Sequence, residues 1–311
     1  MVRSSSYRLS LVAITTLWIA AGFPGLPLAL SLDADTGDAA AENAGSAESP
    51  SIESVTRRAV VVAAVYSLRF HPHSGEHGSE GLIDALEDER YDTLFWFQTE
   101  DLWTHASEWE QQVLRAPVGS LTLEDLESVH ALGDDLQSLL FALGVQTSLP
   151  SPDGTSVGPF MLDALPKVGA SVKSFDATSR LTDVEDLRRA RDLAELWWLR
   201  ASIQHLIDSD ERPDDEALAS MAGEIREEME QMGLEPATIS DNRAYWDELV
   251  RVTAHWAHQE GLCEAPIDDD LPVRGQPFRN LEAFTKATLF RQATNRIWTL
   301  NWLMGSEAGS E

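Results

Sequence analysis

Apolar residues recur at steps of three and four along most of the chain after residue 51, and this spacing constrains the fold more than any other feature. The clearest stripe consists of Leu126, Val129, Leu132, Leu136, Leu139 and Leu143. Thr122 and Asp125 have the spacing of a helix N-terminal capping box, and Gly144 stands where such a helix would end. Strand-like alternation is hard to find. The pattern predicts an all-α fold, a single orthogonal bundle of seven to nine helices on residues 52–305.

Further helix ends can be placed from the same kind of signal. Ser107 and Glu110 have capping-box spacing, and so do Thr182 and Glu185. Gly233 closes an apolar stripe and predicts the end of another helix.

The composition describes a strongly acidic globular protein. In 311 residues, 43% are hydrophobic and the formal net charge is −29, with lysine only at positions 167, 173 and 286. Such a charge repels phosphate backbones, so we expect no nucleic-acid partner. Solubility in high salt and a genome that favours arginine over lysine both account for the composition, and neither identifies a partner.

The N-terminus has the parts of a secretory signal. Arg3 and Arg8 precede the apolar run 9–21, and small residues follow at 29–31. We therefore predict a signal peptide at 1–31 and an exported protein of the cell envelope or extracellular space. A second cut site at 39–41 is an alternative. An uncleaved membrane tether is another, although Pro24 and Pro27 interrupt the apolar stretch.

Two segments outside the helical region are predicted to be disordered. Residues 32–51 are an acidic linker rich in Ala, Asp, Glu, Gly and Ser, and 306–311 form a short tail. Cys263 is the one cysteine, so no internal disulfide can form, and the fold must be held by its core.

Several motifs occur together in an order typical of one bacterial family. They are Arg58-Ala59, Thr104 with Glu108 and Leu114, the segment 136–144, and the run Arg296-Ile297-Trp298-Thr299-Leu300-Asn301-Trp302-Leu303. In this order they resemble the domain-of-unknown-function family 4272, whose members carry an Arg-x-x-Ala-Leu-Asn-Trp-Leu signature near the C-terminus. The resemblance covers most of the chain after the linker, apart from an insertion around 208–243. It implies a helical fold and carries no established activity.

Polar residues stand among tryptophans in two of the predicted helices and form the candidate site. They are Glu195, Arg200, Arg296 and Asn301, beside Trp298 and Trp302. A buried arginine or asparagine needs hydrogen-bond partners, and a buried carboxylate needs a cation. One reading is a structural network in which Glu195 pairs with an arginine. The other is a tryptophan-walled pocket that binds a small ligand.

Histidines offer a weaker metal hypothesis. His71, His73 and His77 share one loop, and His255 and His258 lie three apart on one helix. The run 268–270 lacks the glycine and terminal glutamate of a calcium loop and reads as a solvated turn.

Together these patterns favour a non-enzymatic, exported binding or interaction protein. We expect no cofactor, and the partner is an unknown protein or small molecule. A metal-dependent hydrolase that uses His71, His73 and His77, or His255 and His258, is the first alternative. An envelope protein tethered by its N-terminus is the second.

Overall fold

The computed structural model describes residues 49–72, 80–150, 162–176, 181–209, 215–235, 238–239 and 241–305. Helices dominate this part of the chain, so the all-α prediction is confirmed. The predicted signal peptide, most of the linker and the C-terminal tail lie outside the described residues. Within them, no helix is both long enough and apolar enough to span a bilayer.

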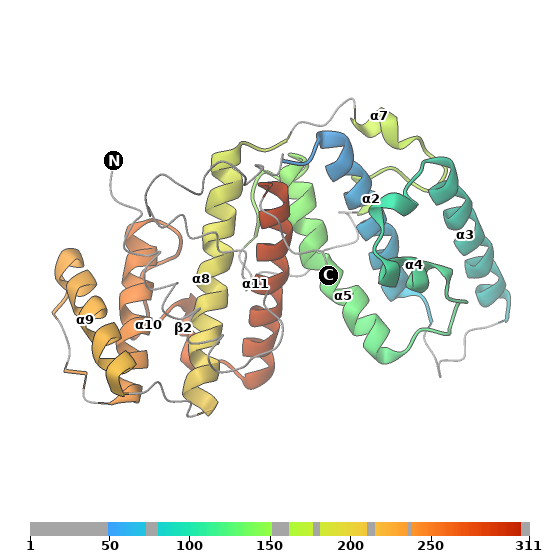
Figure 1. The fold of residues 1–311 in the computed structure, drawn as a ribbon. Helices are drawn as coiled ribbons and strands as arrows, with labels where there is room; N and C mark the ends of the chain where they lie inside the picture. Colours follow the sequence, from blue (N-terminus) through green and yellow to red (C-terminus); the bar gives the residue numbers. More distant parts are fainter. Residues whose placement is uncertain are drawn as a thin grey trace. The chain divides into compact units, whose positions relative to one another are not determined.

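The elements follow one another along the chain as shown in Figure 1. The α-helices are α2 (Ile52–Ser67), α3 (Glu80–Thr99), α4 (Glu108–Arg115), α5 (Leu123–Ala142), α7 (Val172–Asp176), α8 (Val184–Ser209), α9 (Asp215–Met232), α10 (Asn242–Gln259) and α11 (Ala283–Leu303). The remaining elements are the 3₁₀ helices η1 (Leu68–Phe70), η2 (Trp103–His105) and η3 (Phe278–Asn280) and the strands β1 (Pro272–Val273) and β2 (Gln276–Pro277).

The chain divides into two compact units. Among the described residues, unit 1 holds 192–293, and unit 2 holds 49–191 and 294–305. Helices α8 and α11 contribute residues to both units.

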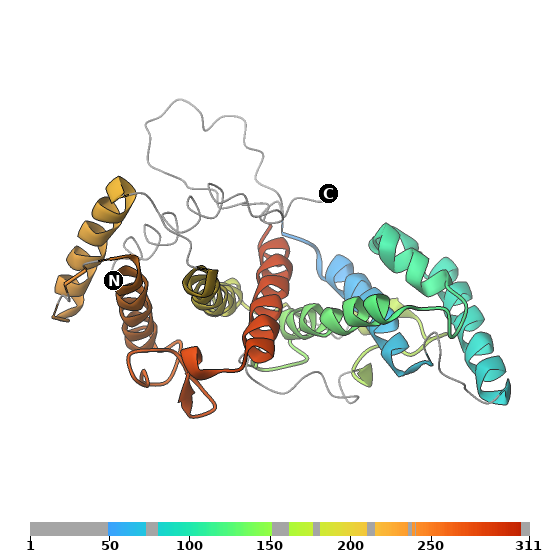
Figure 2. The same ribbon diagram turned by 90° about the horizontal axis from the view of Figure 1, so that it is seen from below.

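Unit 2 is built around the packing of α2 on α5. The two helices lie side by side in Figures 1 and 2. Their buried faces are mostly Val, Ala and Leu, and the Tyr66 ring of α2 lies over Gly133 of α5. Arg69 stacks on the Tyr66 ring, 3.4 Å from its centroid, and so helps to fix its position.

Arginines near the start of α2 attach it to the turns around η2 and α4. Arg57 bonds Glu53 on its own helix and the carbonyl of Glu100. Arg58 donates to the carbonyl of His105 at 3.0 Å and to the Glu110 carboxylate at 2.6 Å. Glu110 is buried, so Arg58 supplies the cation that a buried carboxylate needs.

The capping signals mark most helix starts correctly. Ser107 with Glu110 forms a complete capping box on α4, and Thr122 with Asp125 forms one on α5. The predicted cap at Thr182 is wrong. Asp183 accepts the bond from the Glu185 amide, whereas Thr182 bonds with both its amide and its hydroxyl to carbonyls at the end of α5. The Thr182 hydroxyl therefore bonds to the Phe141 carbonyl, 41 residues earlier, and does not cap α8 as its local spacing predicted.

Unit 1 contains α9 packed on α10, with residues of α8 and α11. Arg251 on α10 binds Glu248 with two nitrogens and also donates to the carbonyl of Glu235 beyond the end of α9. This arginine thus connects the C-terminal end of α9 to α10.

The loop between α10 and α11 makes two consecutive tight turns. Asp268 and Asp269, and then Arg274 and Gly275, all have positive φ. The first pair closes a bridge between Ile267 and Asp270, and the second closes the antiparallel hairpin of β1 and β2. Asn, Asp and Gly tolerate this backbone better than other residues, and both turns match the two-residue hairpin type with positive φ at each position. Strands of two residues are too short to leave an alternating pattern in the sequence, which is why none was expected.

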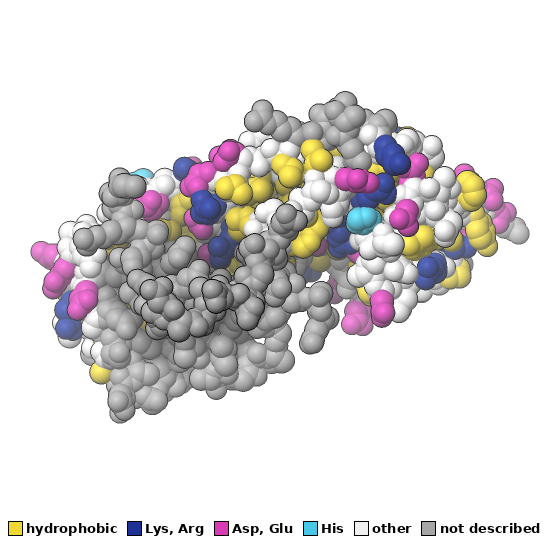
Figure 3. Space-filling view, turned by 45° about the horizontal axis from the view of Figure 1, so that its top comes forward, with side chains coloured by type: hydrophobic (Ala, Val, Ile, Leu, Met, Phe, Trp, Pro, Cys, Tyr) yellow, Lys and Arg dark blue, Asp and Glu magenta, His cyan; other side chains and the backbone are white. Residues whose placement is uncertain are grey.

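The described residues on one face of the molecule show how its acidic side chains are placed. On the face drawn in Figure 3, Asp and Glu are interspersed with Arg and with apolar groups wherever the chain is described.

Two helical glycines give a matched test of the α2–α5 contact. We expect Gly223→Ala in α9 to raise the free energy of unfolding by about 0.5–1 kcal/mol, because a Cβ there meets nothing within 4 Å and alanine favours helix. Gly133→Ala should lower it by about 1–2 kcal/mol, since its Cβ would approach the Tyr66 ring to 3.0 Å. Urea unfolding of both variants measures the difference. A gain at both positions would contradict the close packing of α2 on α5.

Candidate functional site

A cleft of about 340 Å³ opens between the second half of α8 and the first half of α11, within unit 1. Its lining consists of Ala201, Gln204, His205, Asp208, Ala283, Lys286, Ala287 and Phe290. Three alanines and one phenylalanine make an apolar wall, and the other residues are polar. A cleft of this size that combines an apolar wall with a few polar groups is typical of small-ligand sites.

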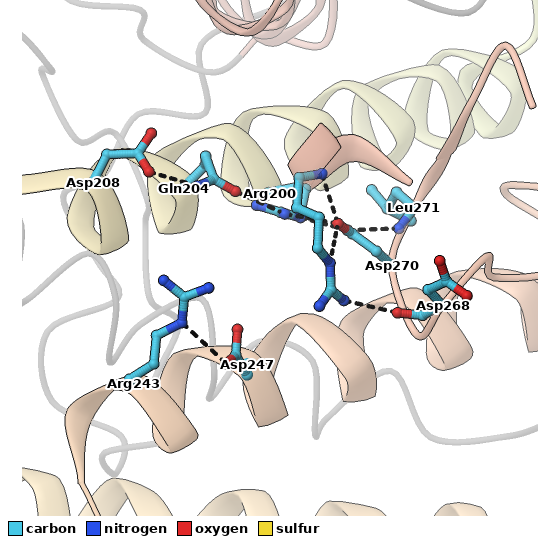
Figure 4. A network of polar contacts seen from close by, with 9 residues as sticks. Arg200, Gln204, Asp208, Arg243, Asp247, Asp268, Asp270 and Leu271 are labelled. Atoms are coloured by element: carbon cyan, nitrogen blue, oxygen red, sulfur yellow. Dashed lines mark hydrogen bonds and ion pairs between the residues drawn. The ribbon is translucent and has the colours of Figure 1, made fainter. Parts of the chain in front are cut away.

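An almost fully buried ion pair lies beside this cleft. Arg200 on α8 is 1% exposed and Asp270 is 0% exposed. The Arg200 Nε and Nη2 donate to the two Asp270 oxygens at 2.6 and 2.8 Å, which is the bidentate geometry of the strongest arginine–carboxylate pairs. The Arg200 guanidinium also lies over the ring of Phe278. Figure 4 shows Asp270 held between Arg200 and the hairpin loop.

The Asp270 carboxylate accepts further bonds from the loop itself. The Leu271 amide donates to one oxygen at 2.8 Å, and the amide of Arg279 donates to the other at 2.9 Å. Burial alone would raise the pKa of Asp270, but the hydrogen bonds and charge of Arg200, with the two amides, outweigh it and lower the pKa. The prediction of a solvated turn at 268–270 is therefore wrong for its last residue. Asp268 and Asp269 are exposed, and Asp270 is the anchor.

Hydrogen bonds lead from this pair to the cleft. The Arg200 Nη2 also donates to the Gln204 Oε1 at 3.0 Å, and the Gln204 Nε2 donates to Asp208 at 2.8 Å. Because Arg200 can only donate, the amide oxygen of Gln204 must face it and the NH₂ group must face Asp208. The three residues stand four apart on one face of α8, and Figure 4 shows them in line.

The arginine of the predicted C-terminal motif has partners within unit 2. Arg296 is buried and bonds the Gln137 Oε1 at 2.9 Å and the carbonyl of Pro150, with Asp134 at 3.4 Å. Glu195 is buried on α8 and belongs to unit 1. Its predicted pairing with an arginine of the motif stays a prediction.

The other residues of the predicted polar site lie near Arg296 on α11. Asn301, Trp298 and Trp302 are half-buried there. The aromatic residue that lines the cleft between α8 and α11 is Phe290, and no tryptophan lines it among the residues that the structure describes. A tryptophan-walled pocket thus remains a hypothesis about α11, separate from the cleft.

The histidines divide between described and undescribed parts of the chain. His71 is half-buried after η1, and burial lowers its pKa, whereas His73 and His77 lie outside the described residues. His255 pairs with Asp269 at 3.0 Å, and His258 lies 3.3 Å from the Cys263 carbonyl. In the described parts of the chain no three His, Cys, Asp or Glu side chains are arranged to hold a metal.

A second group of titratable residues lies in unit 2, where α11 meets α5. The Thr299 hydroxyl donates to Asp135 at 2.7 Å, and Asn295 donates to the carbonyl of Ala131 at 3.1 Å. Burial raises the pKa of Asp135 to about 7, and the charges of Asp134 and Glu110 add to this. The Thr299 bond and the positive charge of Arg58 oppose the shift without cancelling it.

Sequence reasoning found Arg200 but missed its partner and the cleft. The fourfold spacing of Arg200, Gln204 and Asp208 is visible in the sequence and could have indicated a polar face on α8. Lys286 could have been noticed as one of three lysines. Asp270 lies 70 residues from Arg200, and no local signal joins the two.

Breaking the buried ion pair should be costly, and the neighbouring aspartate provides a control. We expect Asp270→Asn to lower the free energy of unfolding by about 3 kcal/mol, because it leaves the Arg200 charge buried without a counterion. Asp269→Asn, at an exposed position in the same turn, should change it by less than about 1 kcal/mol. Urea unfolding of the two variants would contradict this assignment if their effects were equal.

Asp135 gives stability a pH dependence of known sign. Its pKa is about 7 in the folded protein against 3.8 for the unperturbed group, so folding retains a proton that the unfolded chain releases. This carboxyl therefore favours folding fully below about pH 4, and the contribution falls as the pH rises to about 7. Asp135→Asn keeps an acceptor for Thr299 but does not titrate. The free energy of unfolding of this variant minus that of the native protein should therefore be about 1–3 kcal/mol more positive at pH 8 than at pH 4.5. The same relative stability at both pH values, measured by urea unfolding, would contradict the shift.

No protein-family model, curated protein or solved structure matches the chain. The resemblance to family 4272 accordingly stays a prediction from the motifs.

Proposed function

We propose that this chain is a binding protein for a small amphipathic molecule and that the cleft between α8 and α11 is its site. The observation that carries the proposal is the meeting of an apolar wall, formed by alanines and Phe290, with the charged groups of Asp208 and Lys286 in a space of ligand size. Burial of the apolar part of a ligand supplies affinity, and the few charged groups fix its orientation.

The supports of the cleft suit a binding role. Small side chains at positions 201, 283 and 287 leave room between two helices, and the ion pair of Arg200 with Asp270 lies next to it in the core. A wall held by a buried bidentate pair is already organised before a ligand arrives, which reduces the entropy lost on binding. The predicted export of the chain would place this site in the envelope or outside the cell.

A neutral solvatochromic dye tests the location of the site. Nile red should bind the purified protein at one site with increased fluorescence, and Ala287→Phe should weaken this binding at least tenfold by filling the cleft. Ala287 is exposed, so the larger side chain can be accommodated without disturbing the core. Ala85→Phe, at an exposed alanine of α3, is the matched control and should leave the affinity unchanged. Equal affinity in the two variants would exclude the cleft as the binding site.

A further inference from the structure

Two charges at the cleft stand at the unfavourable ends of their helices. Asp208 lies in the last turn of α8, where the helix dipole disfavours an anion, and α8 has no basic residue there. Lys286 lies in the first turn of α11, where the dipole disfavours a cation, and no acidic residue occupies that turn. Both residues line the same cleft. Helix stability does not account for either placement.

The carboxylate of Asp208 is held in place but only partly used. Gln204 donates to its Oδ1, and the orientation of Gln204 is fixed in turn by Arg200. The side chain of Asp208 is exposed, and its described hydrogen bond leaves the second oxygen available. Figure 4 shows this carboxylate at the end of the polar chain that starts at Asp270.

Lys286 presents a cation with no counterion in the described part of the chain. It is half-buried, and no hydrogen bond or ion pair of its ammonium group occurs among the described residues. It is also one of only three lysines in a chain of net charge −29. A half-buried ammonium without an anion loses hydration and gains no partner, so an anionic group on a ligand would stabilise it.

We infer that the ligand is a zwitterion with an apolar side chain, of the α-amino acid type. Its ammonium group pairs with Asp208, its carboxylate pairs with Lys286, and its side chain packs against Ala201, Ala287 and Phe290. A simple anion would be repelled by the charge of −29, and a simple cation would leave Lys286 unpaired, whereas a zwitterion carries no net charge and satisfies both groups. This inference rests on the proposed ligand-binding function.

Three ligands with the same alkyl chain separate the contributions of the two charges. Norleucine carries both groups, hexanoate lacks the ammonium, and pentylamine lacks the carboxylate. Isothermal titration calorimetry should give norleucine at least tenfold the affinity of either analogue. Asp208→Asn should make the affinity for norleucine equal to that for hexanoate. Lys286→Gln should make the affinity for norleucine equal to that for pentylamine. Asp92→Asn and Lys167→Gln, at exposed positions outside the cleft, should keep both preferences.

The outcomes distinguish this inference from the proposed function. The zwitterion assignment is overturned if hexanoate or pentylamine binds as tightly as norleucine. It is also overturned if none of the three binds while Nile red still binds and Ala287→Phe weakens that binding. In both cases the cleft remains a binding site. If norleucine binds and Ala287→Phe does not affect it, the proposed site itself is wrong. Circular dichroism and thermal melting confirm that each variant is folded before its affinity is compared.

Discussion

The need to satisfy buried guanidinium groups organises both units of this protein. Arginine cannot lose its proton in a protein and brings five N–H donors, so its burial requires acceptors placed around a fixed plane. Arg200 is nearly inaccessible to water and takes both oxygens of Asp270. The loop after α10 must therefore bring one aspartate within hydrogen-bonding distance of two guanidinium nitrogens on α8. Its two tight turns, with positive φ at Asp268 and Asp269 and again at the hairpin, give the chain the curvature to do so.

Unit 2 meets the same requirement with a different set of acceptors. Arg296 takes an amide oxygen of Gln137 and a backbone carbonyl, and Asp134 lies slightly further away. Arg58 neutralises the buried Glu110 on α4. Asp135 lies in the same region, and its pKa rises to about 7 chiefly because it is buried, with smaller contributions from the charges of Asp134 and Glu110. The Thr299 hydrogen bond and the positive charge of Arg58 are too weak to cancel the effect of burial.

The fold class was readable from the sequence because helices are specified locally. The stripe ending at Leu143 and the capping boxes at Ser107 and Thr122 involve residues within a few positions of one another. Where a distant partner competes, local reasoning failed. Thr182 bonds to the end of α5, and the helix cap moves to Asp183.

The site was less readable for the same reason. A run of three aspartates looks like a solvated turn when each residue is judged alone. Only the alignment of the turn against α8 decides that the third one is buried and the first two are not. Arg200 was recognised as a polar residue that must be satisfied, but its spacing to Asp270 carries no periodic signal. The cleft depends on which faces of α8 and α11 meet, and helical periodicity describes each face without saying what it packs against.

The two charges at the cleft differ in how firmly they are held, and this difference bears on selectivity. Asp208 is fixed through Gln204 to the buried pair, so its position is set by the core. Lys286 has four methylene groups and no described partner, so its ammonium can move to meet an anion at different distances. Such a site would select strictly for ligands that place a cation at Asp208. It would tolerate variation in the distance between that cation and the anionic group of the ligand. The buried arginine that stabilises unit 1 thereby also sets the geometry of the cleft that we assign to ligand binding.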